Sequence, residues 1–310
     1  ELGEAEENAD AEDTEGEEQT AAEDLSEIVE ALGEADAVLV DEEGEAIPLA
    51  SEEAVEALSS LDPWFLGSDG TTYRYYPAGT DLTAISSCKQ AGPAGTDECF
   101  ASGTPVQDAI NNIYSGGANP IHVETGTYAE TVDISKALIL TGDGGDAFVN
   151  IFNLLAGADV SGSSGVSAPI VKASEGTKIQ DGITLADDGG TVNVGAGTYD
   201  EQVVIDKSLT IQGTGDTTVI EPTKVTQAFN RQKSGGAESD PTNPIVVATA
   251  NTGDPNNVTI NDLKIDSSQV TNWGTGNTNV GILYQGAGGV IDNITFISGT
   301  TVNDIHGSIY

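Results

Sequence analysis

Asp143 and Asp146 are candidate metal ligands, because both carboxylates lie in the short run Gly-Asp-Gly-Gly-Asp. Carboxylate oxygens in such a loop are ligands that calcium accepts. The run lacks the alternating acids of a known calcium loop, so a plain turn is the alternative. The sequence therefore offers calcium as the one cofactor to test and predicts no other.

Two further acidic patterns are typical of turns. Asp187 and Asp188 precede two glycines, which is turn chemistry. Another pattern recurs at matching places in "VTINDLKIDSS" (258–268) and "GVIDNITFISG" (289–299). Its residues are predicted to form a side-chain hydrogen-bond ladder, with a ligand site as the alternative. They are Asn261, Asp262, Asp292 and Asn293.

Cys88 and Cys99 are the only cysteines, and they flank the short loop "CKQAGPAGTDEC". One pair across a tight loop predicts a disulfide in an exported protein. Two unpaired thiols are the alternative. A zinc site is poorly supported, since neither His122 nor His306 lies at a ligand spacing.

The composition limits the partners that this chain can have. Its net charge is −41, and no Lys or Arg precedes Arg74. A protein that follows nucleic-acid phosphates needs a basic face, so nucleic acid is excluded as a partner. Docking on anionic lipid is disfavoured for the same reason. No run of about 20 apolar residues occurs, so no membrane span is predicted.

The chain contains an internal duplication. The segment "IHVETGTYAETVDISKALILTGDG" (121–144) matches "VNVGAGTYDEQVVIDKSLTIQGTG" (192–215), and "TPVQDAI" (104–110) matches "TKIQDGI" (177–183). Within these segments a Gly-x-Tyr element is predicted to turn the chain. Its residues are Gly126 and Tyr128 in the first copy, and Gly197 and Tyr199 in the second.

The sequence divides into four predicted parts. Residues 1–24 are an acidic tail with too few apolar residues to fold. Residues 25–62 form a small α/β module: a first helix, a hairpin around Asp41 to Gly44, and a helix that Ser51 begins. Residues 63–103 are a cap or linker with the cysteines and an aromatic cluster, for which a carbohydrate-stacking platform is the alternative. The cluster comprises Trp64, Phe65, Tyr73, Tyr75 and Tyr76.

Residues 104–310 change to short β-branched runs separated by glycine turns. The only helix candidates are "VQDAINNIY" and "IQDGITLA". Coils that cannot bury their own apolar face need a neighbour stacked on them, so a β-solenoid is predicted. The side chains predicted to point inward are Ile121, Val123, Val132, Ile134, Val192, Val194, Val203, Ile205, Leu209 and Ile211.

The segment "IQDGI…DDGGTVNVGAGTYDEQVVIDKSLTIQGTG" resembles the opening segment of the pectin-lyase-like superfamily. Within this superfamily, the sequence pattern is most similar to that of the pectin methylesterase-like and NosD-like branches. The resemblance covers residues 104–310 and implies a right-handed parallel β-helix, as in bacterial surface β-solenoid proteins. It also implies that the short α-helix at "IQDGI" (179–183) covers the apolar end of the rod. Two copies of the segment mean either two fused solenoids or one segment reused within a longer rod.

The residues that carry catalysis in the resembled enzymes are not found. Methylesterase-like members use paired aspartates, a glutamine and an arginine, but only the Gly-x-Tyr-x-Glu element is matched here, ending at Glu130 and Glu201. Lyase-like members use an arginine beside calcium-binding aspartates, and this chain has only Arg74 and Arg231. No catalytic residue is therefore assigned, and the chain is predicted not to be an enzyme.

The function that these patterns favour is that of a secreted, cell-surface structural or adhesive protein. Its expected partners are other copies of itself, joined head to tail into a filament, or cell-surface polysaccharide. The final "DIHGSIY" ends in a β-like run, which predicts that the rod continues beyond Tyr310 or packs against another copy. The alternatives are a carbohydrate-active β-helix enzyme and a periplasmic NosD-like factor.

Overall fold

The computed structural model describes residues 39–40, 46–47, 61–113, 120–232, 239–249, 256–273 and 278–297. The chain divides into two compact units, Glu1–Ser59 and Ser60–Tyr310. In the first unit, β1 (Leu39–Val40) pairs antiparallel with β2 (Ala46–Ile47), as the predicted hairpin requires. The predicted acidic tail, the first predicted helix and the helix predicted to begin at Ser51 lie outside the described residues.

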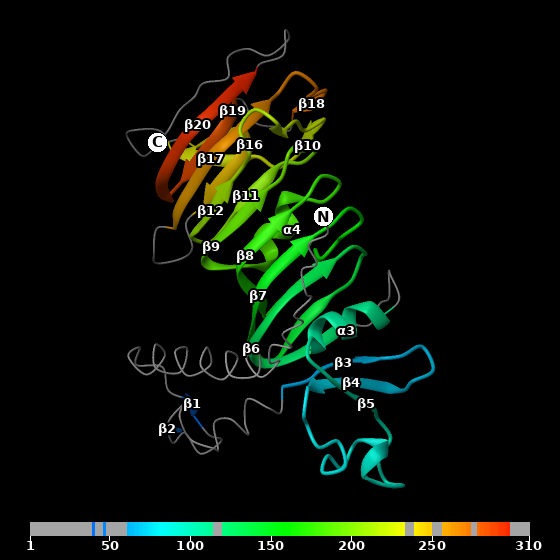
Figure 1. The fold of residues 1–310 in the computed structure, drawn as a ribbon. Helices are drawn as coiled ribbons and strands as arrows, with labels where there is room; N and C mark the ends of the chain where they lie inside the picture. Colours follow the sequence, from blue (N-terminus) through cyan, green and yellow to red (C-terminus); the bar gives the residue numbers. More distant parts are fainter. Residues whose placement is uncertain are drawn as a thin grey trace, which may run out of the picture. The chain divides into compact units, whose positions relative to one another are not determined.

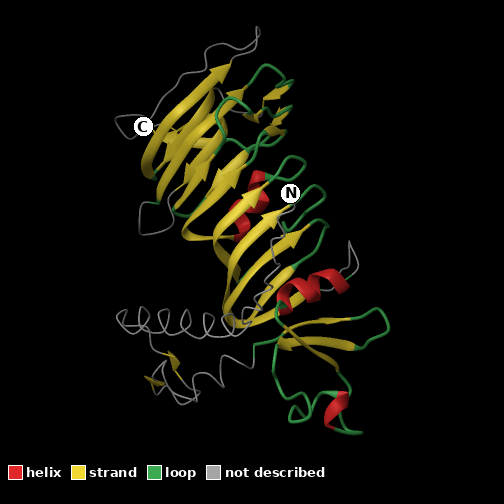
Figure 2. Ribbon diagram, viewed as in Figure 1, coloured by secondary structure: helices red, strands yellow, loops and turns green. Residues whose placement is uncertain are grey.

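The second unit is mainly β, as the sequence predicts, and is built on a large mixed sheet in which most strands run parallel (Figures 1 and 2). Both helix candidates form, as α3 (Pro105–Asn112) and α4 (Ile179–Leu185). No helix in the described ranges is long and apolar enough to cross a membrane.

One row of parallel strands forms most of the large sheet, and Figure 1 shows its members side by side in the order of the pairing. The row consists of β6 (Ile121–Ile134), β7 (Leu140–Leu154), β8 (Val166–Ala173), β9 (Ala186–Val194), β12 (Leu209–Gln212), β17 (Asn257–Asp266) and β20 (Gly288–Ile297).

The cap region joins this sheet at the β6 side. Here β3 (Pro63–Leu66) pairs antiparallel with both β6 and β4 (Thr72–Pro77). Next, β4 pairs parallel with β5 (Glu98–Ser102), and a short 3-10 helix, η1 (Lys89–Ala91), lies in the disulfide loop. The predicted cap is therefore an extension of the sheet.

The remaining strands of the second unit form further pairs, most of them parallel. In the large sheet, β10 (Gly197–Tyr199) pairs with β13 (Thr218–Ile220), which also pairs with the second half of β17. A second sheet contains β11 (Val203–Ile205), β16 (Ser239–Thr249), β19 (Thr278–Gln285) and the antiparallel β15 (Phe229–Gln232). Finally, β14 (Lys224–Val225) pairs with β18 (Asn272–Trp273).

The two copies of the duplicated segment differ in how their strands are divided. From residue 192 to residue 205 the second copy forms β9, β10 and β11, whereas the matching part of the first copy forms the single long strand β6. The difference follows from the partners. Strand β6 pairs along its length with β7, and two register shifts absorb its turn positions, whereas β9, β10 and β11 pair with different strands.

The prediction of the core is confirmed, because all ten side chains predicted to point inward are buried. Register pairing places one inward residue per strand in a continuous column, and each member covers its neighbour. The column runs Val132, Phe152, Val171, Val192, Ile211, Ile260 and Ile291. Strand β9 of the second copy therefore continues the sheet that the first copy begins.

Candidate functional site

The residues shared by the two copies form the same contacts twice. Both carboxylate oxygens of Glu130 accept hydrogen bonds from the first backbone N–H groups of α3, at Val106 and Gln107, each at 3.0 Å. In the second copy Glu201 accepts from Ile179 at 2.6 Å and from Gln180 at 3.1 Å, at the start of α4. A helix N-terminus leaves such donors unsatisfied, so a carboxylate there stabilises the helix.

The shared glutamine of each helix pairs with a strand edge. The side chain of Gln180 donates to the carbonyl of Val204 at 3.0 Å and accepts from its N–H at 2.9 Å. Gln107 makes the equivalent two bonds with Asp133 of β6. An amide side chain therefore occupies the place of a neighbouring strand. The helices satisfy edges that could otherwise pair with another chain.

The shared lysine and tyrosine also have structural roles. Lys136 donates to the carbonyl of Ile113 at 2.6 Å, and Lys207 donates to that of Ala186 at 2.8 Å, each at the C-terminus of its helix. The hydroxyls of Tyr128 and Tyr199 donate to the carbonyls four residues earlier, at 2.9 and 3.1 Å. In both copies the polar residues hold the fold together.

The shared glycines allow close packing. Gly126 and Gly197 have φ values of 156° and 151°, a region that other residues adopt with strain. A Cβ at Gly126 would lie 2.4 Å from the Leu61 side chain, and one at Gly197 would lie 2.9 Å from Glu175. Gly126 and Tyr128 lie within β6 beside its two register shifts, and Gly197 and Tyr199 are the ends of β10, so the predicted turn residues lie in strands.

Replacing Glu201 with Gln is expected to lower the free energy of unfolding by about 1–2 kcal/mol, because one acceptor of two backbone N–H groups is lost. Glu130→Gln should have a similar effect through α3. Thermal and urea unfolding measure both. The matched control is Glu175→Gln, an exposed residue of the same region. An unchanged midpoint for both helix-capping variants would contradict this role.

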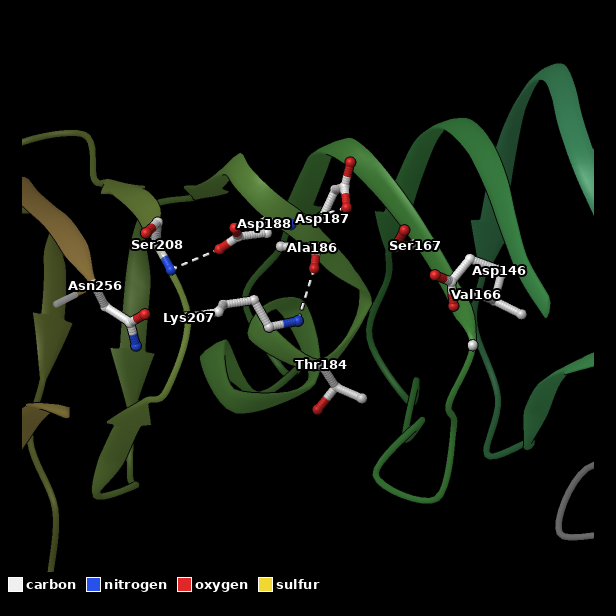
Figure 3. Close-up of a pocket in the computed structure, with 11 residues that line it drawn as sticks. Asp146, Val166, Ser167, Thr184, Ala186, Asp187, Asp188, Lys207, Ser208 and Asn256 are labelled. Atoms are coloured by element: carbon white, nitrogen blue, oxygen red, sulfur yellow. Dashed lines mark hydrogen bonds between the residues drawn. The ribbon is translucent and has the colours of Figure 1, made fainter. Parts of the chain in front are cut away.

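An acidic cleft of about 460 Å³ lies at the amino ends of β8, β9, β12 and β17 (Figure 3). Lys207 points into the cleft and donates to the carbonyl of Ala186, while Asp188 accepts from the backbone of Ser208 at 2.9 Å. Asp187 accepts from the N–H of Asp188, and both residues lie within β9 rather than in the predicted turn. Asp146 lines the cleft on the far side from Asn256.

The calcium candidates do not converge. Asp143 and Asp146 are exposed, and the backbone carbonyl of Asp143 accepts from Thr125 at 3.1 Å. Among the described residues there is no group of three or more His, Cys, Asp or Glu side chains placed to hold a metal ion. Both residues lie within strand β7, so the plain turn does not form there, and the calcium site stays a prediction.

The ladder residues lie in register on neighbouring strands. Asn261 of β17 is opposite Asp292 of β20, and Asp262 accepts a hydrogen bond from the Asn293 side chain. Gln212 of β12 also donates to Asp262, at 2.8 Å, and these two hydrogen bonds lower the pKa of that carboxyl. Asp262 and Asn293 both have positive φ, at 53° and 50°, which is the conformation these residue types tolerate.

The cap contains the predicted disulfide and an ionic cluster that the sequence did not reveal. Cys88 and Cys99 are bonded, with Cα atoms 5.6 Å apart. Arg74 contacts Asp62 and Asp97, each at 2.8 Å, and its guanidinium lies 5.3 Å from the centre of the Trp64 ring.

The ring of Trp64 stacks on His122 of β6 at 4.0 Å, which ties the cap to the long sheet. Burial is the largest cause that raises the pKa of Glu124, followed by its hydrogen bond with the Asp62 carboxyl. The aromatic residues also stack on one another, since Phe65 contacts both Tyr73 and Tyr75. These contacts are those of a packed cap.

Comparison with known proteins adds no family: no protein-family model, curated protein or solved structure matches this chain. The resemblance to the pectin-lyase-like superfamily therefore remains a prediction.

The sequence identified Asn261 but missed the outward column to which it belongs. Register pairing aligns Asp133, Asn153, Lys172, Asn193, Gln212, Asn261 and Asp292. The signal was present as three scattered tripeptides, Thr191-Val-Asn193, Thr210-Ile-Gln212 and Thr259-Ile-Asn261. Only the pairing shows that they are neighbours.

Proposed function

We propose that the chain from residue 104 is a right-handed parallel β-helix that acts as a secreted structural or adhesive protein. Three sets of parallel strands support the helical winding, since each set recurs in chain order. They are β9, β12, β17 and β20; β10, β13 and the second half of β17; and β11, β16 and β19. A chain that returns to the same three faces buries one continuous core.

The observation that carries the structural role is the use of the duplicated polar residues. Glu201, Gln180 and Lys207 are each committed to a helix end or a strand edge, and their first-copy counterparts make the same contacts. Duplicating such a unit therefore gives the chain two helices that cover strand edges. It does not duplicate a set of catalytic residues. The disulfide supports an oxidising, extracellular location.

Self-association through β20 follows from the difference between the two ends of the strand row. Helix α3 and β3 cover β6, whereas among the described strands only β17 pairs with β20. Large apolar side chains are exposed on β20, with Val290 at 53% and Phe296 at 41%. An open, apolar edge strand pairs with another chain.

The covered β6 end favours one geometry of association over the other. A head-to-tail filament needs a free edge at both ends, whereas two β20 edges can pair around a two-fold axis. We therefore propose that copies meet at their β20 edges. The alternative is a head-to-tail filament, in which β20 of one copy meets the β6 end of the next.

Val290→Lys/Phe296→Lys is expected to abolish this association, because lysine on an edge strand opposes pairing. Light scattering after size exclusion should give a doubled mass for the native chain at micromolar concentration and a single-chain mass for the variant. Phe148→Lys is the matched control, since Phe148 is another exposed aromatic residue. A single-chain mass for the native protein at every concentration would contradict the proposal.

The second candidate function is carbohydrate cleavage, which the cleft lined by Asp146, Asp187 and Asp188 favours. Two carboxylates flanking a glycosidic bond are the usual requirement for hydrolysis. Incubation with pectin and alginate, followed by measurement of new reducing ends, separates the two functions. The structural proposal expects no product above a heat-denatured sample.

A further inference from the structure

Two outward columns of side chains run along the strand row, one on each side of the buried column. The first is the polar column that contains Asn261. The second consists of Thr131, Ile151, Ile170, Thr191, Thr210, Thr259 and Val290. On the three central strands, β9, β12 and β17, every position of both columns is a threonine, asparagine or glutamine.

The spacing of this array is regular. No register shift interrupts the pairing between Ile170 of β8 and Asp292 of β20. Neighbouring strands lie about 4.8 Å apart, and the two columns are separated by about 6.6 Å along each strand. The full row from β6 to β20 therefore extends about 29 Å.

Only some polar groups of the array lack a partner within the chain, because Gln212 donates to Asp262 and accepts from Asn261, and Asn153 donates to Asp133. Within the part of the chain that the structure describes, no hydrogen-bond partner is found for the hydroxyls of Thr191, Thr210 and Thr259, which are half-buried. The amide oxygens of Asn153 and Asn261 also lack a partner among the described residues. Buried acceptors without a partner are uncommon and call for an explanation, such as a donor supplied from outside the chain.

Charge selects the kind of ligand. The chain carries a net charge of −41, yet the three central rungs of the array carry none. A polyanion would be repelled by the surrounding surface, and a cation would find no carboxylate on these rungs. An uncharged polymer with many hydroxyl groups suits both conditions. The flanking side chains of Ile170 and Val290, exposed at 37% and 53%, suit the apolar faces of sugar rings.

We propose that this array binds an extended, uncharged polysaccharide chain. One hexose of such a chain is close in length to the separation of neighbouring strands, so successive sugars meet successive rungs. The threonine hydroxyls can then donate to and accept from the sugar hydroxyls, and the amide oxygens without a partner can accept from them. The inference rests on the proposed adhesive function and specifies the partner class and the surface that binds it.

The test uses the full chain and soluble hexasaccharides. Isothermal titration with cellohexaose, xylohexaose, mannohexaose and chitohexaose measures binding of neutral chains, and hexagalacturonate is the charged comparison. The variant Thr191→Val/Thr210→Val/Thr259→Val removes three hydroxyls while keeping side-chain shape and strand propensity. The control is Thr127→Val/Thr198→Val, which changes exposed threonines outside the array. Circular dichroism verifies that both variants fold.

We expect at least one neutral hexasaccharide to bind, and the triple variant to bind it about tenfold more weakly or worse, as the loss of hydroxyl hydrogen bonds requires. The control should bind as the native chain does, and hexagalacturonate should bind more weakly. Equal binding by the triple variant, absence of binding to all four neutral chains, or preference for hexagalacturonate would overturn the proposal.

Self-association is measured in the same samples by light scattering, so that the two proposals fail separately. A triple variant that binds glycan normally but loses association would assign the array to a second copy of the chain. If the triple variant loses glycan binding and still self-associates as the native chain does, the array is a glycan-binding surface. This conclusion holds for any number of copies in the assembly.

Discussion

Replacing Ile205 with Asp should lower the free energy of unfolding by about 4 kcal/mol or more. Ile205 is fully buried and pairs with Ala248 in the second sheet. A carboxylate at this position would be removed from water without a partner, which is among the most destabilising single changes. Urea unfolding followed by circular dichroism measures the loss.

Thr198→Asp is the control for this variant, because Thr198 is exposed on β10, the strand that precedes β11 in the chain. It should change the midpoint by no more than a typical surface substitution does, about 0.5 kcal/mol. Should Ile205→Asp unfold at the native midpoint, the assignment of this column to the core would be wrong.

Replacing Arg74 with Ala is expected to destabilise the second unit by about 3 kcal/mol, because it leaves Asp62 and Asp97 buried without their cation. Asp62 is only 1% exposed and Asp97 is 8% exposed. The same change removes the guanidinium from the face of Trp64 and so loosens its stack on His122. Thermal unfolding with tryptophan fluorescence follows both effects.

Lys89→Ala provides the contrast, since Lys89 forms a surface ion pair with Glu98. Exposed pairs contribute about 0–1 kcal/mol, so little change is expected. Adding Asp62→Asn to Arg74→Ala should recover part of the loss, because the uncompensated charge is removed. If Arg74→Ala and Lys89→Ala lose the same stability, the buried cluster does not hold the cap in place.

The sequence was sufficient to predict the elements whose signals are local. The alternation around Val192 and Ile205 gave the buried face, and the spacing of Cys88 and Cys99 gave the disulfide. Helices α3 and α4 follow from two matched apolar patterns.

The features that the sequence did not reveal depend on contacts between distant residues. Asp62, Arg74 and Asp97 meet only after β3 and β4 pair, and nothing in their spacing predicts it. The length of β6 was missed because its turn residues are identical in type to those of the second copy. The partner strand β7 decides whether those positions break the strand or bulge within it.

The array of threonines and amides was missed for a related reason. Thr210 and Thr259 are far apart in the chain but opposite each other in the sheet, so no window of sequence contains both. A repeat of fixed length would have revealed the alignment, but the insertions between these coils differ in length. Register pairing is the missing information.

Electron microscopy of the purified chain over a range of concentrations, with and without calcium, tests the central claim most directly. The account predicts particles joined in pairs at one end, and it predicts that Val290→Lys/Phe296→Lys leaves only single particles. The calcium samples test the one cofactor that the sequence offers, at Asp143 and Asp146. Single native particles at every concentration would contradict the claim that the chain assembles through the edge of β20.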